Sequence, residues 1–136
     1  MRASLIGSHL NYFNMFFIVC MFIFPHLPEI NGTSDSKHVN QTPFFIIRET
    51  GESVEREINC SHNIPNHDVI LWYKQDEHKA LKLLGYLNVK FVNLEEDVKG
   101  KISFGGDARK QSSLTISNLT LKDSAVYFCA ARLAQC

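Results

Sequence analysis

The sequence predicts an all-β fold in which two sheets pack face to face, and three observations support this. From Val39 onward, short runs of strand-forming residues alternate with turn signals, a spacing typical of β-sandwiches. Several runs alternate apolar and polar residues, so that one face of each strand points toward a core. An early run contains Cys60 and the last one contains Cys129, and a secreted protein permits a disulfide between them.

The N-terminal residues differ from the rest and predict a signal peptide over residues 1–32. Residues 15–24 form an unbroken apolar run, which is far shorter than the ~20 residues of a transmembrane helix. Arg2 precedes this run, and prolines and small polar residues follow it, the order of a secretory leader cut near Gly32. We therefore expect a domain over residues 33–131 in the secretory pathway, with no direct membrane contact.

The first half of the domain begins with an interrupted strand. Residues 39–42 and 44–48 are two pieces of an edge strand separated by Pro43, because proline cannot donate to a sheet ladder. In residues 54–60, Ile58 and Cys60 share one face, and charged residues mostly take the other. Residues 69–75 start with an apolar run, which predicts a strand buried on both faces.

The second half continues this pattern to the last strand. Leu114 and Ile116 point inward, and Leu119 continues their apolar set. In the last strand, Tyr127 and Cys129 share one face. The expected strands are residues 81–86, 102–104, 112–116 and 125–130, with a polar, turn-rich loop over 88–100.

Four residues together match the hallmarks of an immunoglobulin sandwich. Trp72 follows Cys60 by 12 residues, and Tyr127 precedes Cys129 on the last strand. In that fold the cysteines tie the sheets together, the indole fills the space of about 10 Å between them, and the tyrosine hydroxyl bonds back to the preceding turn. We place these side chains in the core: Trp72, Tyr127, Leu114, Ile116 and Leu119.

Several longer motifs extend this match, namely Ile58-Asn59-Cys60, Trp72-Tyr73-Lys74-Gln75, segments 81–86 and 114–116, and Asp123-Ser124-Ala125-Val126-Tyr127-Phe128-Cys129-Ala130-Ala131. On these motifs, residues 39–131 resemble the variable domain of a T-cell receptor, most like a β chain of a bony fish. The motifs are very specific to variable-type domains and separate β from α chains weakly. The resemblance implies a V-type immunoglobulin β-sandwich, a Greek key lacking the final strand, and antigen recognition at the cell surface.

Variable domains of this family pair with a partner variable domain, here the T-cell receptor α chain. Because Trp72 points inward, Tyr73 and Gln75 on the same strand point outward, and residues of the two adjacent strands join them. Such a face offers apolar area for burial and one amide whose hydrogen bond fixes the register of the two domains. The alternative is that Leu81 and Leu83 belong to the core. We favour the interface, because outward apolar residues that no partner covers would form an aggregation-prone patch. The expected interface is Tyr73, Gln75, Leu81, Leu83 and Phe128.

The resemblance also implies that loops bind a peptide held by a major histocompatibility (MHC) molecule, and that CD3 signalling subunits join through a constant region. The loops are residues 61–68 and 86–93 and a third loop after Ala131, with 105–110 as an exposed loop of lesser role. The expected ligand contacts are His62, Asn63, Asn66, His67, Asp68, Tyr86, Asn88 and Lys90.

Two further features are structural expectations. Lys101 and Asp123 match an ion pair that holds one strand start against the turn before the last strand. Glycosylation sequons occur at Asn31, Asn40, Asn59 and Asn118. Asn40 and Asn118 are the favoured acceptors, because Asn31 is close to the predicted cleavage point and Asn59 lies on a strand.

Residues 132–136 predict a truncated stub of the third loop. Finished receptors of this family continue into a last strand with a Phe-Gly-x-Gly bulge, so the sequence resembles an unrearranged germline segment. The recombination heptamer CACAGTG, read after a G, encodes Ala-Gln followed by Cys or Trp, which matches Ala134-Gln135-Cys136; the alternative is a genuine free thiol. We expect the edge of strand 125–130 to be unpaired and the isolated product to fold poorly.

Other functions find less support in the sequence. The formal net charge is +0, which gives no sign of nucleic-acid binding. His62, His67, Asp68 and His78 lack the spacing of a metal site, and no nucleophile elbow or phosphate-binding glycine motif indicates an enzyme or a cofactor. The open alternatives are an α chain, an antibody light chain, and a non-rearranging innate immune or adhesion receptor.

Overall fold

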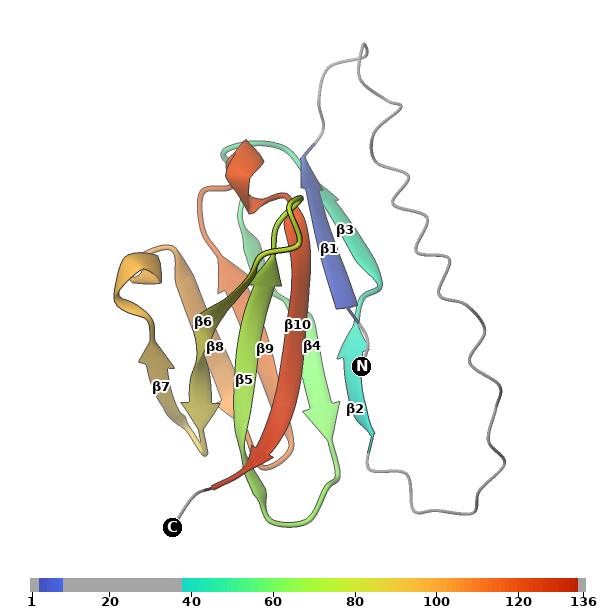
Figure 1. Ribbon diagram of the computed structural model, residues 1–136, viewed down its shortest axis with the longest axis vertical. Coiled ribbons are helices and arrows are strands. Elements are labelled where there is room, and N and C mark those ends of the chain that lie inside the picture. The colour runs from blue at the N-terminus through green and yellow to red at the C-terminus, as the bar shows by residue number, and fades with distance from the viewer. Residues whose placement is uncertain (1–2, 9–37, 135–136) are drawn as a thin grey trace, which may run out of the picture.

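The computed structural model describes residues 3–8 and 38–134, which form two packed β-sheets (Figure 1). The six-stranded sheet has the order β3-β1-β10-β5-β6-β7 and the four-stranded sheet the order β2-β4-β9-β8. The predicted all-β immunoglobulin V-type sandwich is confirmed. No helix among these residues is long and apolar enough to cross a membrane.

The larger sheet comprises β1 (Ala3–Ser8), β3 (Phe45–Arg48), β5 (His67–Gln75), β6 (Leu81–Asn88), β7 (Phe91–Leu94) and β10 (Ala125–Leu133). The smaller comprises β2 (Val39–Thr42), β4 (Val54–His62), β8 (Ile102–Asp107) and β9 (Gln111–Ile116), and two 3₁₀ turns are η1 (Glu96–Val98) and η2 (Leu121–Asp123).

The chain changes sheets at Pro43. The sequence predicts one interrupted edge strand there, whereas β2 pairs with β4 and β3 belongs to the opposite sheet. Proline has no N–H to continue the ladder with β4, so the chain is free to leave the first sheet at this residue. A second difference is β7, which lies within the predicted loop 88–100. Its Phe91 is 75% exposed, and this edge strand lacks the inward and outward alternation that would reveal it in the sequence.

The core lies between the two sheets and contains the predicted residues. Cys60 and Cys129 form a disulfide with their Cα atoms 6.3 Å apart. Trp72 is fully buried, stacks on Phe104 with ring centroids 6.4 Å apart, and donates from Nε1 to Ser112 Oγ at 2.9 Å. Leu114, Ile116 and Leu119 are buried around this group.

Gly85 lies opposite Trp72 in the β5–β6 register, next to an irregularity in that pairing. Its φ is +145°, and an added Cβ would lie 2.2 Å from the Asn93 carbonyl oxygen of β7. Glycine therefore permits β6 and β7 to approach each other closely.

The edge of β10 is occupied, which differs from the sequence prediction. β1 pairs antiparallel with β10 over residues 125–128 and parallel with β3 (Figure 1). The physical reason is that the exposed N–H and C=O groups of an edge strand accept another strand readily. Apart from residues 3–8, the predicted leader lies outside the described residues, as do Asn31 and Cys136.

Candidate partner interface and recognition loops

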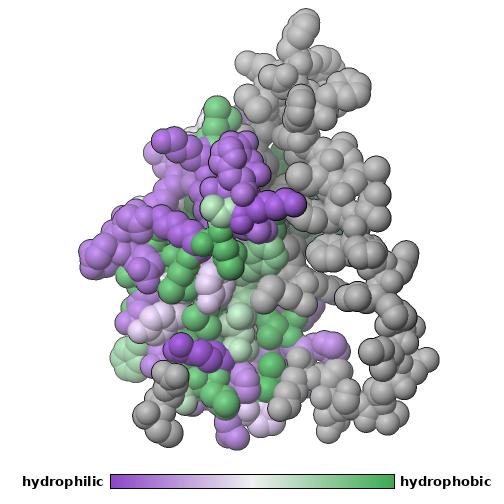
Figure 2. Space-filling view, viewed as in Figure 1, coloured by the Kyte–Doolittle hydropathy of each residue, from purple (hydrophilic) through white to green (hydrophobic). Residues whose placement is uncertain are grey.

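The outward face of β5, β6 and β10 carries a mixed apolar surface. Tyr73 pairs with Leu83 on one side and Phe128 on the other, so these three side chains form a row across the sheet. Gln75 pairs with Leu81, which is 61% exposed, and the other four are partly exposed. Figure 2 shows hydrophobic residues gathered over the middle of the molecule in the view of Figure 1. The geometry thus brings together all five residues that the sequence assigns to an interface.

The turn after β4 is shorter than the predicted loop 61–68. β4 continues to His62 and β5 begins at His67, so that only residues 63–66 are irregular. Asn63 and Asn66 are exposed, and His67 and Asp68 are partly buried on β5. His62 is buried and bonded inward, which is a correction to its placement among ligand contacts, because a strand side chain at this register points between the sheets.

The second predicted loop is a tight hairpin between β6 and β7. Tyr86 and Asn88 lie on β6, and Lys90 is exposed at the turn. Val89 has a φ of 52°, a left-handed conformation that is strained for a β-branched residue. Its N–H donates to the Asp68 carbonyl oxygen of β5 at 2.8 Å, so the hairpin is bonded to the end of the neighbouring strand.

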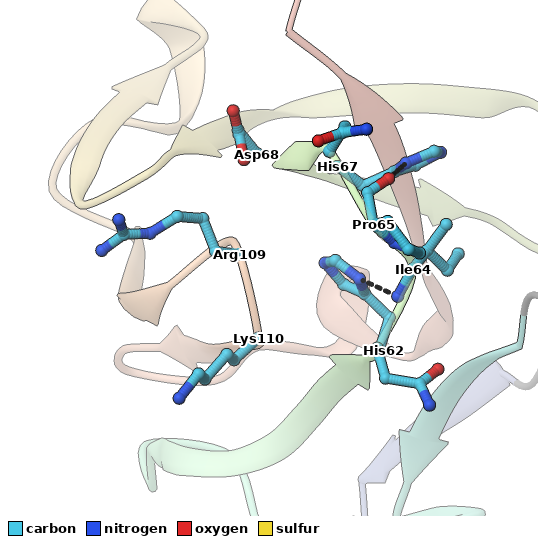
Figure 3. A pocket seen from close by; sticks show the side chains of 9 residues that line it. His62, Ile64, Pro65, His67, Asp68, Arg109 and Lys110 are labelled. Atoms are coloured by element: carbon cyan, nitrogen blue, oxygen red, sulfur yellow. Dashed lines mark hydrogen bonds between the residues drawn. The ribbon is translucent and has the colours of Figure 1, made fainter.

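The turn between β8 and β9 lies at the same end of the sandwich. The predicted exposed loop 105–110 is shorter in the structure, because β8 continues to Asp107. Arg109 donates to Asp107 from Nε at 2.9 Å, and its hydrogen bonds hold the pKa of that carboxyl well below its usual value. Arg109 and Lys110 face residues 62–68 across an open depression of about 570 Å³ (Figure 3).

The third predicted loop begins later than Ala131. β10 continues to Leu133, with Arg132 opposite Val69 and Leu133 opposite His67 after a register shift. The pairing with β5 extends the strand because the long partner supplies hydrogen-bond groups up to its own first residue. Within the described part of the chain, the end of the sandwich that carries the predicted ligand loops therefore consists of three short turns beside the end of β10.

An ion-pair cluster at the opposite end fixes the start of β10. Asp123 accepts from Lys101 Nζ at 2.7 Å and from the Thr120 N–H at 2.7 Å. Burial alone would raise the pKa of Asp123, but the hydrogen bonds from Lys101 and Thr120 outweigh it and lower the pKa. Tyr127 donates from its hydroxyl to the Asp123 carbonyl oxygen at 2.9 Å, and burial raises the pKa of this tyrosine far above its ordinary value.

Gln41 is a connecting residue that sequence reasoning missed. It is 1% exposed on β2. Its Nε2 donates to the Tyr127 carbonyl oxygen at 2.7 Å, and its Oε1 accepts from the Cys129 N–H at 3.0 Å. The available signal is an amide at the inward-facing position of a short strand, two residues after Val39.

The three sequons in the described region occupy different environments. Asn40 is exposed on β2, the edge strand of the smaller sheet. Asn118 is exposed between β9 and η2 with a φ of 47°. Asn59 lies within β4 between β2 and β9, and its amide donates to the Glu57 carbonyl oxygen at 3.1 Å. Asn40 and Asn118 thus present their side chains more openly than Asn59.

Comparison with known proteins places this geometry in a family. Residues 42–135 match the immunoglobulin V-set domain. Human T cell receptor beta variable 3-1 is 38% identical over 93 residues, 68% of this chain and 79% of that protein. Human T cell receptor alpha variable 5 is 32% identical over 103 residues, 75% of this chain and 86% of that protein.

A solved structure supports the same assignment. It concerns the structural basis of T cell specificity and activation by the bacterial superantigen toxic shock syndrome toxin-1. The TM-score is 0.66 at 27% sequence identity, and the match covers 74% of this chain and 85% of that chain. The chain belongs to the immunoglobulin V-set family and, like the T-cell receptor variable domains to which it is similar, is a receptor domain and not an enzyme.

Proposed function

We propose that this chain is the variable region of a T-cell receptor β chain that recognises antigen after pairing with an α-chain variable domain. The outward row of Leu83, Tyr73 and Phe128 carries this proposal, because its side chains are apolar yet partly exposed. A face of this composition gains stability when a second domain covers it. The similarity to both β and α variable segments supports a pairing partner of the same fold.

The ligand of the paired receptor is a peptide held by an MHC molecule. Three turns at one end of the sandwich support this part of the proposal, since turns held by rigid strands are common sites of recognition. Asn63, Asn66 and Lys90 are exposed there and offer hydrogen-bond groups. His67, Asp68, Tyr86 and Asn88 flank these turns on the strands.

The proposal includes the route to the cell surface. The relatives are variable regions of T-cell receptor chains, and a disulfide between Cys60 and Cys129 suits an oxidising compartment. The predicted leader would direct the chain there, glycans would attach at Asn40 and Asn118, and CD3 subunits would join through a constant region.

A pairing measurement tests the interface directly. The chain is co-expressed with an α-chain variable domain, and the dissociation constant of the complex is measured by sedimentation. Leu81→Asp places a charge on the proposed interface, and we expect at least about tenfold weaker pairing, equal to about 1.4 kcal/mol. Leu81 is 61% exposed in the single chain, so its replacement leaves the fold intact.

The matched control is Leu121→Asp, because Leu121 is 55% exposed and lies on η2, away from the proposed interface. It should pair like the unmodified chain. Equal dissociation constants for the two variants would refute the proposed interface.

A further inference from the structure

His62 connects two of the three turns at this end of the sandwich, the turn after β4 and the turn between β8 and β9. The Ile64 N–H donates to its Nδ1 at 3.2 Å, so Nδ1 is an acceptor and the neutral ring carries its proton on Nε2 (Figure 3). That Nε2 lies 2.7 Å from the Ala108 carbonyl oxygen and donates to it. One buried imidazole therefore bonds both to the turn after β4 and to the turn between β8 and β9.

Ala108 extends this connection to the second hairpin. Its side chain is fully buried, and its N–H donates to the Val89 carbonyl oxygen at 2.7 Å. Val89 in turn donates to the Asp68 carbonyl oxygen at 2.8 Å. The bonds form a continuous chain from β4 through both other turns to β5, and they hold Val89 in its left-handed conformation.

We propose that the turn between β8 and β9, residues 108–110, fixes the two proposed ligand loops relative to each other, and we call this turn the hub. His62 is the positioning residue that bonds the first of these loops to the hub. The proposal rests on the proposed function only in calling these turns ligand loops. The sequence assigns a lesser role to this turn and a direct ligand contact to His62. The geometry instead gives His62 an indirect role through Ala108.

Both ring nitrogens of His62 are engaged, Nδ1 as an acceptor and Nε2 as a donor. A side chain that keeps only one of these two bonds should therefore release one turn and leave the other held. The ring of His67 lies near, with centroids 6.3 Å apart.

Amide hydrogen exchange on the full, oxidised chain without ligand tests the hub. In the unmodified chain, the amides of Ala108 and Val89 should exchange at rates within about threefold of each other, because one chain of bonds protects both. The Cys129 amide, bonded to Gln41 in the core, should keep its protection and reports that the domain stays folded. Exchange of the Ala108 and Val89 amides at rates more than about threefold apart would overturn the proposal.

Two substitutions separate the two bonds of His62. His62→Asn keeps an acceptor near Nδ1 and loses the donor, so Ala108 and Val89 should exchange about tenfold faster while Ile64 stays protected. His62→Gln keeps a donor near Nε2 and loses the acceptor, so the reverse pattern is expected.

The matched control is His67→Asn, which removes the neighbouring ring and should leave these patterns unchanged. Equal loss of protection at all three amides in both His62 variants would assign His62 a merely structural role and refute the hub. The comparison of the Ala108 and Val89 amides in the unmodified chain decides even where a variant fails to fold. The exchange experiment uses the single chain without ligand or partner, so its result does not depend on whether the pairing experiment succeeds.

Discussion

Replacing Gln41 by leucine should destabilise the domain more than any change on its surface. The side chain is 1% exposed and makes two hydrogen bonds, at 2.7 Å to Tyr127 and 3.0 Å to Cys129. Leucine fills a similar volume but leaves a backbone carbonyl and a backbone N–H unpaired in the core. Each unsatisfied group costs about 1–3 kcal/mol, so we expect a loss of about 2–6 kcal/mol. Domains of this size are stable by only about 5–15 kcal/mol.

Urea unfolding of the oxidised chain, followed by Trp72 fluorescence, measures this loss. Gln111→Leu is the matched control, because Gln111 is exposed on β9 and surface substitutions usually stay within about 0.5 kcal/mol. The midpoint should fall in Gln41→Leu and remain near that of the parent in the control. If both variants unfold at the same urea concentration, the two bonds contribute nothing net and the reasoning is wrong.

Two further substitutions test other parts of the fold. Gly85→Ala should cost about 1–3 kcal/mol or more in urea unfolding, because its Cβ would lie 2.2 Å from the Asn93 oxygen. Gly100→Ala, also at positive φ but with no atom within 4 Å, is the control, and an equal cost would contradict the steric argument. Asp123 has a lowered pKa, so its stabilisation is complete above the unfolded value of about 3.9 and is lost as pH falls through the folded value. Asp123→Asn should therefore be less stable near neutral pH and lose less stability on acidification; parallel stability curves down to about pH 2 would refute this.

The sequence predicts the centre of the sandwich better than its ends. Cys60, Trp72 and Tyr127 identify the fold because their spacing follows from how two sheets pack around a disulfide. Strand ends depend instead on the partner strand. β10 extends to Leu133 because β5 continues beside it to His67, and nothing local in the sequence specifies that length.

Buried polar residues explain most of what the sequence leaves open in the site. His62 and Gln41 follow the alternation of their strands, which predicts that they point inward. Their partners are carbonyl and N–H groups far along the chain, at Ala108, Tyr127 and Cys129. A periodic pattern contains no information about such pairs, so a histidine next to a polar turn is naturally read as a loop residue that contacts ligand.

The edge of β10 shows how the predicted leader and the observed sheet constrain each other. β1 pairs with β10 over residues 125–128, and Gln41 takes the next N–H at Cys129. If residues 1–32 are cleaved as the sequence predicts, Gln41 remains, but the backbone groups paired with β1 lose their partner. An edge in that state must be covered, or it recruits another chain. The leader prediction and a stable monomeric sandwich are therefore compatible only if another strand, such as the last strand of a finished receptor variable domain, takes the place between β3 and β10.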